Sequence, residues 1–220
     1  MDFFFNITFQ KINKVRSLNV GMEMSPELAR IHAHLCGDGS VFIFKKTKKT
    51  KDRRKWDGGI GYYNNNQKLL DKFRADFSKL FGVKMKMRKN VYVFARSVQR
   101  AKDFINKFGS FKSREWRIHP SIKNSSKEIK LEWLKAFFED EAYDEKRYNR
   151  LKTKSINFNG LEDAKELLDS LGIFCTLTGP NCDETYYLTV PKFSYVNEFS
   201  DFVKEPIRKK TNFKSKHTHQ

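Results

Sequence analysis

Two segments half a chain apart repeat the same order of residue types, and this repeat constrains the fold more than any other feature. Residues 31–39 and 134–142 match in kind: aliphatic, small, apolar, acidic and small residues recur at equivalent positions. Each segment reads as the end of an apolar helix that delivers one carboxylate, Asp38 in the first and Glu141 in the second. A repeat on this scale predicts two similar halves that associate with each other.

The spacing within each segment predicts how the two halves meet. On the first helix a stripe of apolar residues follows i, i+3, i+7 spacing, and small residues at i, i+4, i+8 form a flat second face. The stripe is Leu28, Ile31 and Leu35, and the flat face is Ala29, Ala33 and Gly37; the second helix has the stripe Leu131, Leu134 and Phe138, with Ala136 on the flat side. Small residues let helix backbones approach closely. Packing these faces together would bring the two acids to the same end of the helix pair.

That end is an unfavourable place for acids unless a cation lies between them. The C-terminus of a helix carries partial negative charge, and a second carboxylate nearby adds repulsion. Hard oxygen ligands with open positions suit Mg²⁺, which keeps several waters and favours phosphate substrates. The alternative is a pair of exposed acids that end two amphipathic helices.

The charge of the chain indicates a polyanionic partner. Its 220 residues contain 44 Lys and Arg against 26 Asp and Glu, a net charge of +18 with a pI of about 9.8. Nucleic acid is the usual partner of such a protein. A ribosomal-type or membrane-surface protein would show the same excess, but interleaved aromatic and alternating patterns favour an ordered domain.

Cysteine usage and hydropathy indicate a cytoplasmic protein. The three Cys are odd in number and form no CxxC, so neither a disulfide framework nor a zinc site is indicated, and a reducing compartment fits. No segment reaches the ~18 consecutive apolar residues of a membrane span. Residues 1–10 are apolar but lack a basic region and a small-residue cleavage site, so we expect an extension that packs on the domain and no targeting signal.

Caps, breakers and periodicity divide the chain into five parts: an extension (1–24), a first half (25–110), a linker (111–126), a second half (127–203) and a basic tail (204–220). The first half is predicted as αββαββα, with a helix at 26–37, strands at 40–44 and 56–63, a helix at 67–81, strands at 83–89 and 91–96, and a helix at 98–108. The second half is predicted with a helix at 127–142, strands at 146–151 and 153–158, a helix at 161–171, strands at 173–178 and 186–190, and a helix at 191–203. Pro120 is expected to break regular structure in the linker.

Basic residues at strand spacing predict a binding face on each sheet. Side chains at every second position of a strand point to one side of the sheet. These cations are Lys84, Lys86 and Arg88 in the first half and Arg150, Lys152 and Lys154 in the second. A Lys/Arg-rich hairpin tip and two further arginines extend the set: Lys46, Lys48, Lys49, Lys51, Arg53, Arg54, Arg96 and Arg147. The faces read as almost wholly positive and fit a DNA groove; the alternative is a solvated outer face.

The paired motifs and the order of elements around them resemble the LAGLIDADG homing endonucleases, in their single-chain, archaeal intron-encoded form. The resemblance implies an α+β fold of two pseudo-twofold-related αββαββα halves that form a saddle of antiparallel sheets on DNA. It implies a monomer, without an obligate protein partner, that cuts both strands of a long, specific duplex across the minor groove and leaves short 3′ overhangs.

Carried over residue by residue, the resemblance implies that Asp38 and Glu141 bind metal, assisted by the backbone carbonyls of Gly37 and Asp140. It implies Mg²⁺ as the cofactor, with Mn²⁺ as a substitute and Ca²⁺ binding without supporting cleavage. Candidates for the accessory catalytic cations are Lys112 and Lys146. The chain departs from the family in two places: Asn64 and Asn65 stand where Gln or Lys is usual, and Asp140 and Ala142 replace the commoner small residue and Gly.

Other interpretations remain open at this point. A binding protein of the same fold, either an RNA maturase or a DNA-binding regulator without cleavage, would share these features; an acid in both motifs favours the enzyme. An unrelated basic RNA-associated protein would leave the repeat unexplained. His32 and Cys36 have the i, i+4 spacing of a metal site, but no matching ligands recur in the second half, so helix packing is favoured. His34 and His119 follow no pattern.

Overall fold

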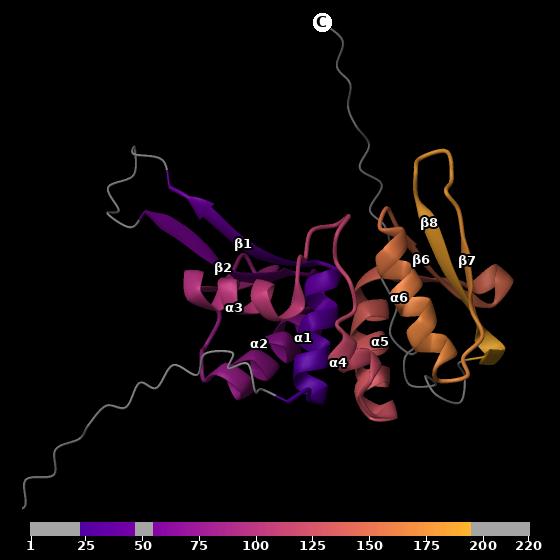
Figure 1. Cartoon of the computed structure of the whole chain (residues 1–220), viewed down its shortest axis with the longest axis horizontal. Coiled ribbons are helices and arrows are strands. Elements are labelled where there is room, and N and C mark those ends of the chain that lie inside the picture. The colour runs from indigo at the N-terminus through magenta and orange to yellow at the C-terminus, as the bar shows by residue number, and fades with distance from the viewer. Residues whose placement is uncertain (1–22, 47–54, 195–220) are drawn as a thin grey trace, which may run out of the picture.

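The computed structural model describes residues 23–46 and 55–194, arranged as two halves that each combine helices with an antiparallel sheet (Figure 1). Four predictions fall outside these residues: most of the extension at 1–24, the hairpin tip at 47–54, the last helix beyond residue 194 and the tail at 204–220. Among the described helices, none is both long enough and apolar enough to cross a bilayer.

The first half has the predicted order αββαββα. Its elements are α1 (Pro26–Cys36), β1 (Gly39–Lys45), β2 (Trp56–Tyr63), α2 (Gln67–Phe81), β3 (Lys86–Arg88), β4 (Tyr92–Arg96) and α3 (Val98–Phe108). Local signals set the helix ends: Ser25 caps α1, Asn66 caps α2, and Gly82 ends α2 with a left-handed φ of 65°. The first strand of the second hairpin is shorter than predicted, because residues 83–85 lie outside β3.

The second half repeats this order. It contains α5 (Lys127–Glu141), β5 (Ala142–Glu145), β6 (Arg150–Ser155), α6 (Phe158–Asp169), β7 (Thr176–Thr178) and β8 (Tyr186–Pro191). The sheets have equivalent strand orders, β1-β2-β4-β3 and β5-β6-β8-β7. The predicted α+β fold of two related halves is therefore confirmed.

Three local predictions in and before the second half were wrong. The strands predicted at 146–151 and 153–158 lie earlier, because β5 begins directly after α5 and residues 146–148 form a short 3-10 turn. Pro120 begins the short helix α4 (Pro120–Lys123), since proline suits the first position of a helix. Strand β8 continues to Pro191, and helical residues begin only at Lys192.

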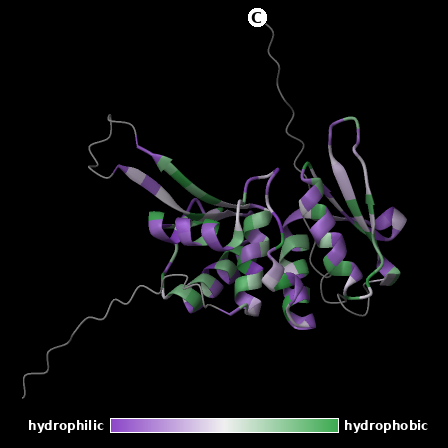
Figure 2. Cartoon of the chain, viewed as in Figure 1, coloured by the Kyte–Doolittle hydropathy of each residue, from purple (hydrophilic) through white to green (hydrophobic). Residues whose placement is uncertain are grey.

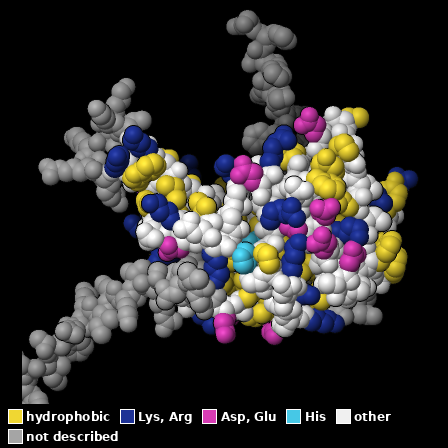
Figure 3. All heavy atoms as spheres, in the orientation of Figure 1, with side chains coloured by type: hydrophobic (Ala, Val, Ile, Leu, Met, Phe, Trp, Pro, Cys, Tyr) yellow, Lys and Arg dark blue, Asp and Glu magenta, His cyan; other side chains and the backbone are white. Residues whose placement is uncertain are grey.

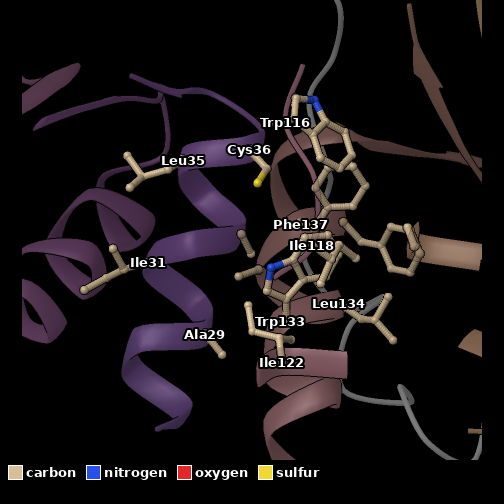
Figure 4. Packing of buried hydrophobic residues seen from close by; sticks show 14 of the residues in the cluster. Ala29, Ile31, Leu35, Cys36, Trp116, Ile118, Ile122, Trp133, Leu134 and Phe137 are labelled. Atoms are coloured by element: carbon tan, nitrogen blue, oxygen red, sulfur yellow. The ribbon is translucent and has the colours of Figure 1, made fainter. Parts of the chain in front are cut away.

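Helices α1 and α5 lie side by side at the centre of the molecule, and their facing surfaces form the core of the interface between halves (Figures 1 and 4). The small residues Ala29, Ala33 and Ala136 are fully buried, as the predicted flat faces require. Trp133 and Phe137 of α5 stack with ring centroids 5.0 Å apart. The central helices carry both hydrophobic and hydrophilic residues (Figure 2), and their buried hydrophobic residues belong to one continuous core that joins both halves.

An ion-pair network also links the halves. The Arg30 guanidinium on α1 donates to both Asp76 oxygens on α2, at 2.8 and 2.7 Å, and to Glu132 Oε2 on α5 at 2.5 Å. The bonds to Asp76, and next those to Glu132, outweigh burial and raise the pKa of Arg30. Because charges buried without partners are costly, these contacts fix how α1 sits on α5.

Candidate functional site

The ends of α1 and α5 converge at the seam. A Cβ atom added at Gly37 would lie 3.0 Å from Asp140 Cβ and Oδ2, and 3.4 Å from Glu141 Oε1. A side chain at this position would therefore force the end of α5 to shift by a few tenths of an ångström. The structure thus brings Glu141 beside the residue that precedes Asp38, at one end of the helix pair, as the packing of small faces predicts.

A buried hydrogen-bond network lies directly beneath these ends, centred on the side chain of Asp140. His34 Nδ1 is 2.8 Å from Asp140 Oδ2, and Tyr62 donates its hydroxyl to Oδ1 at 2.6 Å. Asn64 Nδ2 donates to Asp140 Oδ1 at 3.2 Å and lies 3.4 Å from Asp38 Oδ2. Asn64 therefore connects the buried carboxylate of the second half to the motif acid of the first.

Burial and charge keep the Tyr62 hydroxyl of this network protonated. Burial, and then the negative charge of Asp140, raise the pKa of the Tyr62 hydroxyl far above its ordinary value, so the phenol remains a donor. The preceding acid on α5, Glu139, has its pKa raised by burial. Tyr62 and Asn64 therefore donate to one buried carboxyl group, that of Asp140.

Sequence analysis assigned Asp140 only a backbone role and found no pattern in His34. Asn64 appeared only as a departure from the family. The structure shows that all three side chains, with Tyr62, form one cluster. The sequence signal that could have pointed to the cluster was Asp140 itself, a carboxylate where the family the motifs resemble usually has a small residue.

Glu141 lines a cavity of about 280 Å³ that lies between the end of α1, the linker and β6. Lys154 and Ser155 line it as well. Ala142 pairs with Thr153, so Glu141 and Lys154 each adjoin one residue of this pair. The sequence interpretation placed Lys154 only on the binding face; the structure adds that it faces the cavity of a motif acid.

The two accessory candidates fall in different places. Lys112 lies between two residues that line the cavity, Phe111 and Ser113, and its ammonium is 3.1 Å from Glu115 Oε1. Lys146 lies in the turn after β5, and that four-residue strand carries the chain about 13 Å away from Glu141. The structure therefore does not bring Lys146 to the motif acids. Asn65 is exposed and, unlike Asn64, is not one of the residues that bond to Asp140.

The donor set at the helix ends fits an open divalent-cation site rather than a closed one. Asp38 and Glu141 offer carboxylate oxygens, the ligands that Mg²⁺ and Ca²⁺ prefer. Within residues 23–46 and 55–194, no three His, Cys, Asp or Glu side chains gather in a way that could enclose a metal. Mg²⁺ is commonly held by one or two carboxylates together with waters and substrate phosphates, so two acids suffice.

His32 and Cys36 take part in packing. His32 is fully buried; its Nδ1 lies 3.6 Å from Cys36 Sγ and accepts a hydrogen bond from Trp133 Nε1 at 3.0 Å. Burial lowers the pKa of His32 to about 3. The imidazole is therefore neutral and serves the contact between the helices.

The two predicted cationic faces differ. In the second half, Arg150 Nε is 2.5 Å from Glu145, and Lys154 Nζ is 2.5 Å from Asp183. Lys152 lies 3.8 Å from Glu145 Oε1. The expectation of an almost wholly positive face is therefore wrong for this sheet, because acids on neighbouring elements interleave with the cations. Arg147 lies in the turn after β5, against the Tyr148 ring.

In the first half, Lys84, Lys86 and Arg88 are exposed, although Lys84 precedes β3. Lys46 and Arg96 lie 3.8 Å and 3.2 Å from Asp57 Oδ2. The remaining predicted contacts, Lys48, Lys49, Lys51, Arg53 and Arg54, lie outside the described residues.

Comparison with solved structures shows that the chain has the fold of the LAGLIDADG homing endonucleases. The similar structures include I-DmoI in complex with DNA and Ca, with 15% identity, a TM-score of 0.61, and coverage of 85% of this chain and 95% of that one. I-DmoI with DNA and Mn has 16% identity, a TM-score of 0.59, and coverage of 80% and 96%. Neither a protein-family model nor a curated protein matches the sequence, so the likeness is one of structure.

Proposed function

We propose that this chain is a divalent-metal-dependent DNA endonuclease. The observation that carries the proposal is the convergence of Asp38 and Glu141 at adjacent helix ends between two sheets. The net charge of +18 supports a nucleic-acid substrate. The similar I-DmoI structures contain DNA with Mn or Ca, which supports a DNA substrate and a divalent cation for this chain.

Asp38 and Glu141 would hold the cation, together with the backbone carbonyls of Gly37 and Asp140. When bound, the cation supplies activation of a water and stabilisation of the leaving oxygen of a phosphodiester. Asn64 orients the Asp38 carboxylate, and the Asp140 network holds Asn64 in place. Lys154 lines the same cavity as Glu141, and its ammonium, now 2.5 Å from Asp183, would stabilise a phosphate oxygen if it turned toward the cavity.

The finer proposal is a site-specific enzyme that acts as a monomer. The two acids belong to different halves, so each half would direct the cut of one strand of a duplex lying across both sheets. Cuts across the minor groove would leave short 3′ overhangs. Mg²⁺ would support cleavage, Mn²⁺ would substitute, and Ca²⁺ would support binding only. An origin within an archaeal intron, and use on the nucleoid in the cytoplasm, belong to the same proposal.

The experiment selects cleavable sites and then removes each acid. A library of randomised duplexes is incubated with the protein and Mg²⁺, and cut ends are captured and sequenced. We expect one family of long sites, cut with Mg²⁺ and uncut with EDTA. Asp38→Asn and Glu141→Gln keep the size of each side chain and remove the charge that holds the cation, so each should lower the cleavage rate at least about 100-fold.

Duplex binding with Ca²⁺ measures whether the variants still fold and bind. Both should bind, because like-charge repulsion at the helix ends is relieved. The matched control is Asp71→Asn, an acid on the outer surface of α2 whose partner is Arg74; it should cut like the parent. Cleavage that persists in either acid variant would place the active site elsewhere. Tight binding without cleavage of any site would favour the maturase or the DNA-binding regulator.

A further inference from the structure

The face of the first sheet that points away from the helices is lined with aromatic rings. Side chains alternate along each strand, and Ile60, Val93 and Ala95 point into the core. The residues that alternate with them therefore face outward. Five of these are aromatic: Phe42 and Phe44 on β1, Tyr63 on β2, and Tyr92 and Phe94 on β4.

Glycines on the central strand let these rings lie flat. Gly59 and Gly61 of β2 also point outward, between the aromatic strands. A Cβ at Gly61 would lie 2.1 to 2.6 Å from Tyr92 ring atoms and its hydroxyl, and a Cβ at Gly59 would lie 3.3 Å from Phe42 Cζ. The Tyr92 side chain therefore lies directly over the backbone of Gly61, where any side chain on β2 would displace it.

The rings form two nearly parallel pairs. Tyr92 and Phe94 have centroids 5.5 Å apart with an interplanar angle of 15°, and Phe42 and Phe44 are 6.1 Å apart at 22°. Phe44 is 51% exposed and Tyr63 is 45% exposed. A sheet that only covered its glycines would not need this much exposed ring area.

Cations border the same rings. The register places Lys86 across from Phe94 and Arg88 across from Tyr92, and both cations are exposed. Arg96 follows on β4, across from Gly59. Figure 3 shows hydrophobic side chains together with Lys and Arg over the arm formed by β1 and β2. On the first sheet Arg96 lies beside one acid, Asp57, whereas Arg150, Lys152 and Lys154 on the equivalent face of the second sheet all lie beside acids.

We propose that this aromatic face binds the unstacked bases of a single-stranded nucleic acid, with Lys86, Arg88 and Arg96 on its phosphates. In a duplex the bases present only their edges, whereas flat exposed rings pair with the π-faces that a single strand offers. Aromatic platforms on four-stranded sheets recognise single strands through such stacking. Because Lys86, Arg88 and Arg96 border the rings, a polyanion fits this face better than an apolar protein partner does. This binding is separate from strand cleavage and needs no divalent cation.

The experiment measures fluorescence anisotropy of labelled oligo-dT and oligo-U in EDTA, with a mixed-sequence duplex of the same length as competitor. The full chain is compared with Phe44→Ala and Phe94→Ala. Each alanine variant should weaken single-strand binding between about 5-fold and about 150-fold, the effect of losing one stacked base, and should weaken duplex binding by a clearly smaller factor. Phe94→Tyr keeps the ring and should restore binding. A preference between the two oligonucleotides identifies RNA or DNA as the ligand.

The control is Phe174→Ala, which removes a ring that is 56% exposed in the second half and should leave single-strand binding unchanged. Circular dichroism melting confirms that each variant is folded. Equal binding by the face variants and the control would overturn the proposal. So would an equal loss on duplex and single strand, which would make the face a duplex contact. A dimer of the parent that the face variants dissociate would overturn it as well, because a second copy would then be the occupant.

Discussion

Replacing Asp140 by alanine tests whether the buried network, rather than hydrophobic packing alone, holds the two halves in register. The carboxylate accepts from Tyr62 and Asn64 and bonds His34, and it is only 4% exposed. Alanine is close to the small residue that usually occupies this position in the family the motifs resemble. If packing decided everything, the substitution would cost little.

The expected cost follows from what the substitution leaves behind. A buried polar group left without its hydrogen-bond partner costs about 1–3 kcal/mol, and this substitution affects three such groups at once, so we expect a loss of about 3–5 kcal/mol. His34 and Tyr62 are 1% and 0% exposed, so water cannot replace the carboxylate easily. For a chain of this length, a Tm decrease of about 2–4 °C per kcal/mol gives a decrease of about 6–20 °C. Asp140→Asn keeps the shape and one acceptor and should cost less.

The assay is urea unfolding followed by circular dichroism, for Asp140→Ala, Tyr62→Phe and the double variant. The two side chains touch at 2.6 Å, so their effects should be non-additive by more than about 0.5 kcal/mol. The double variant should be less unstable than the sum of the single ones. A loss below about 1 kcal/mol in Asp140→Ala, or strict additivity in the cycle, would refute the structural role assigned to the network.

Three further outcomes are expected. Because the pKa of His32 falls from 6.5 to about 3 on folding, the unfolded chain binds the proton first; urea midpoints should therefore decrease as pH falls from about 6.5 towards 3, and less so in His32→Gln. Gly160→Ala places a Cβ 2.5 Å from the Trp116 ring, so thermal melting should show a loss of about 1–3 kcal/mol. Replacing Lys86 and Arg88 by alanine should flatten the dependence of log K on log [salt] for duplex binding by up to about 2 units, measured by titration at several NaCl concentrations. The first prediction would be contradicted by an unchanged pH profile, the second by an unchanged melting point and the third by an unchanged salt slope.

Features determined locally could be predicted from the sequence. Asn66 and Gly82 mark both ends of α2, and the predicted bounds agree with the structure. The first strand after α5 could not be predicted in place, since Ala142, Tyr143, Asp144 and Glu145 are mostly not strong strand formers. Pairing with β6 decides their conformation, which is a tertiary effect.

The candidate site likewise has a part that could be predicted from the sequence and a part that depends on contacts between distant residues. The repeat predicted that Asp38 and Glu141 approach each other, because two small helix faces determine that geometry. The Asp140 network could not be predicted, since its contacts join residues 106 and 78 positions apart in the chain. The aromatic face was missed for another reason: sequence analysis weighed alternating cations on these strands but did not weigh the alternating rings and glycines beside them.

The network around Asp140 also determines which halves can associate. His34 and Tyr62 belong to the first half and Asp140 to the second, and the motif alignment places Gly37 at the position equivalent to Asp140. Two first halves would set His34 against a glycine, and two second halves would bury Asp140 without a histidine. Neither symmetric pair is satisfied, so separately expressed halves should recover the fold only when mixed.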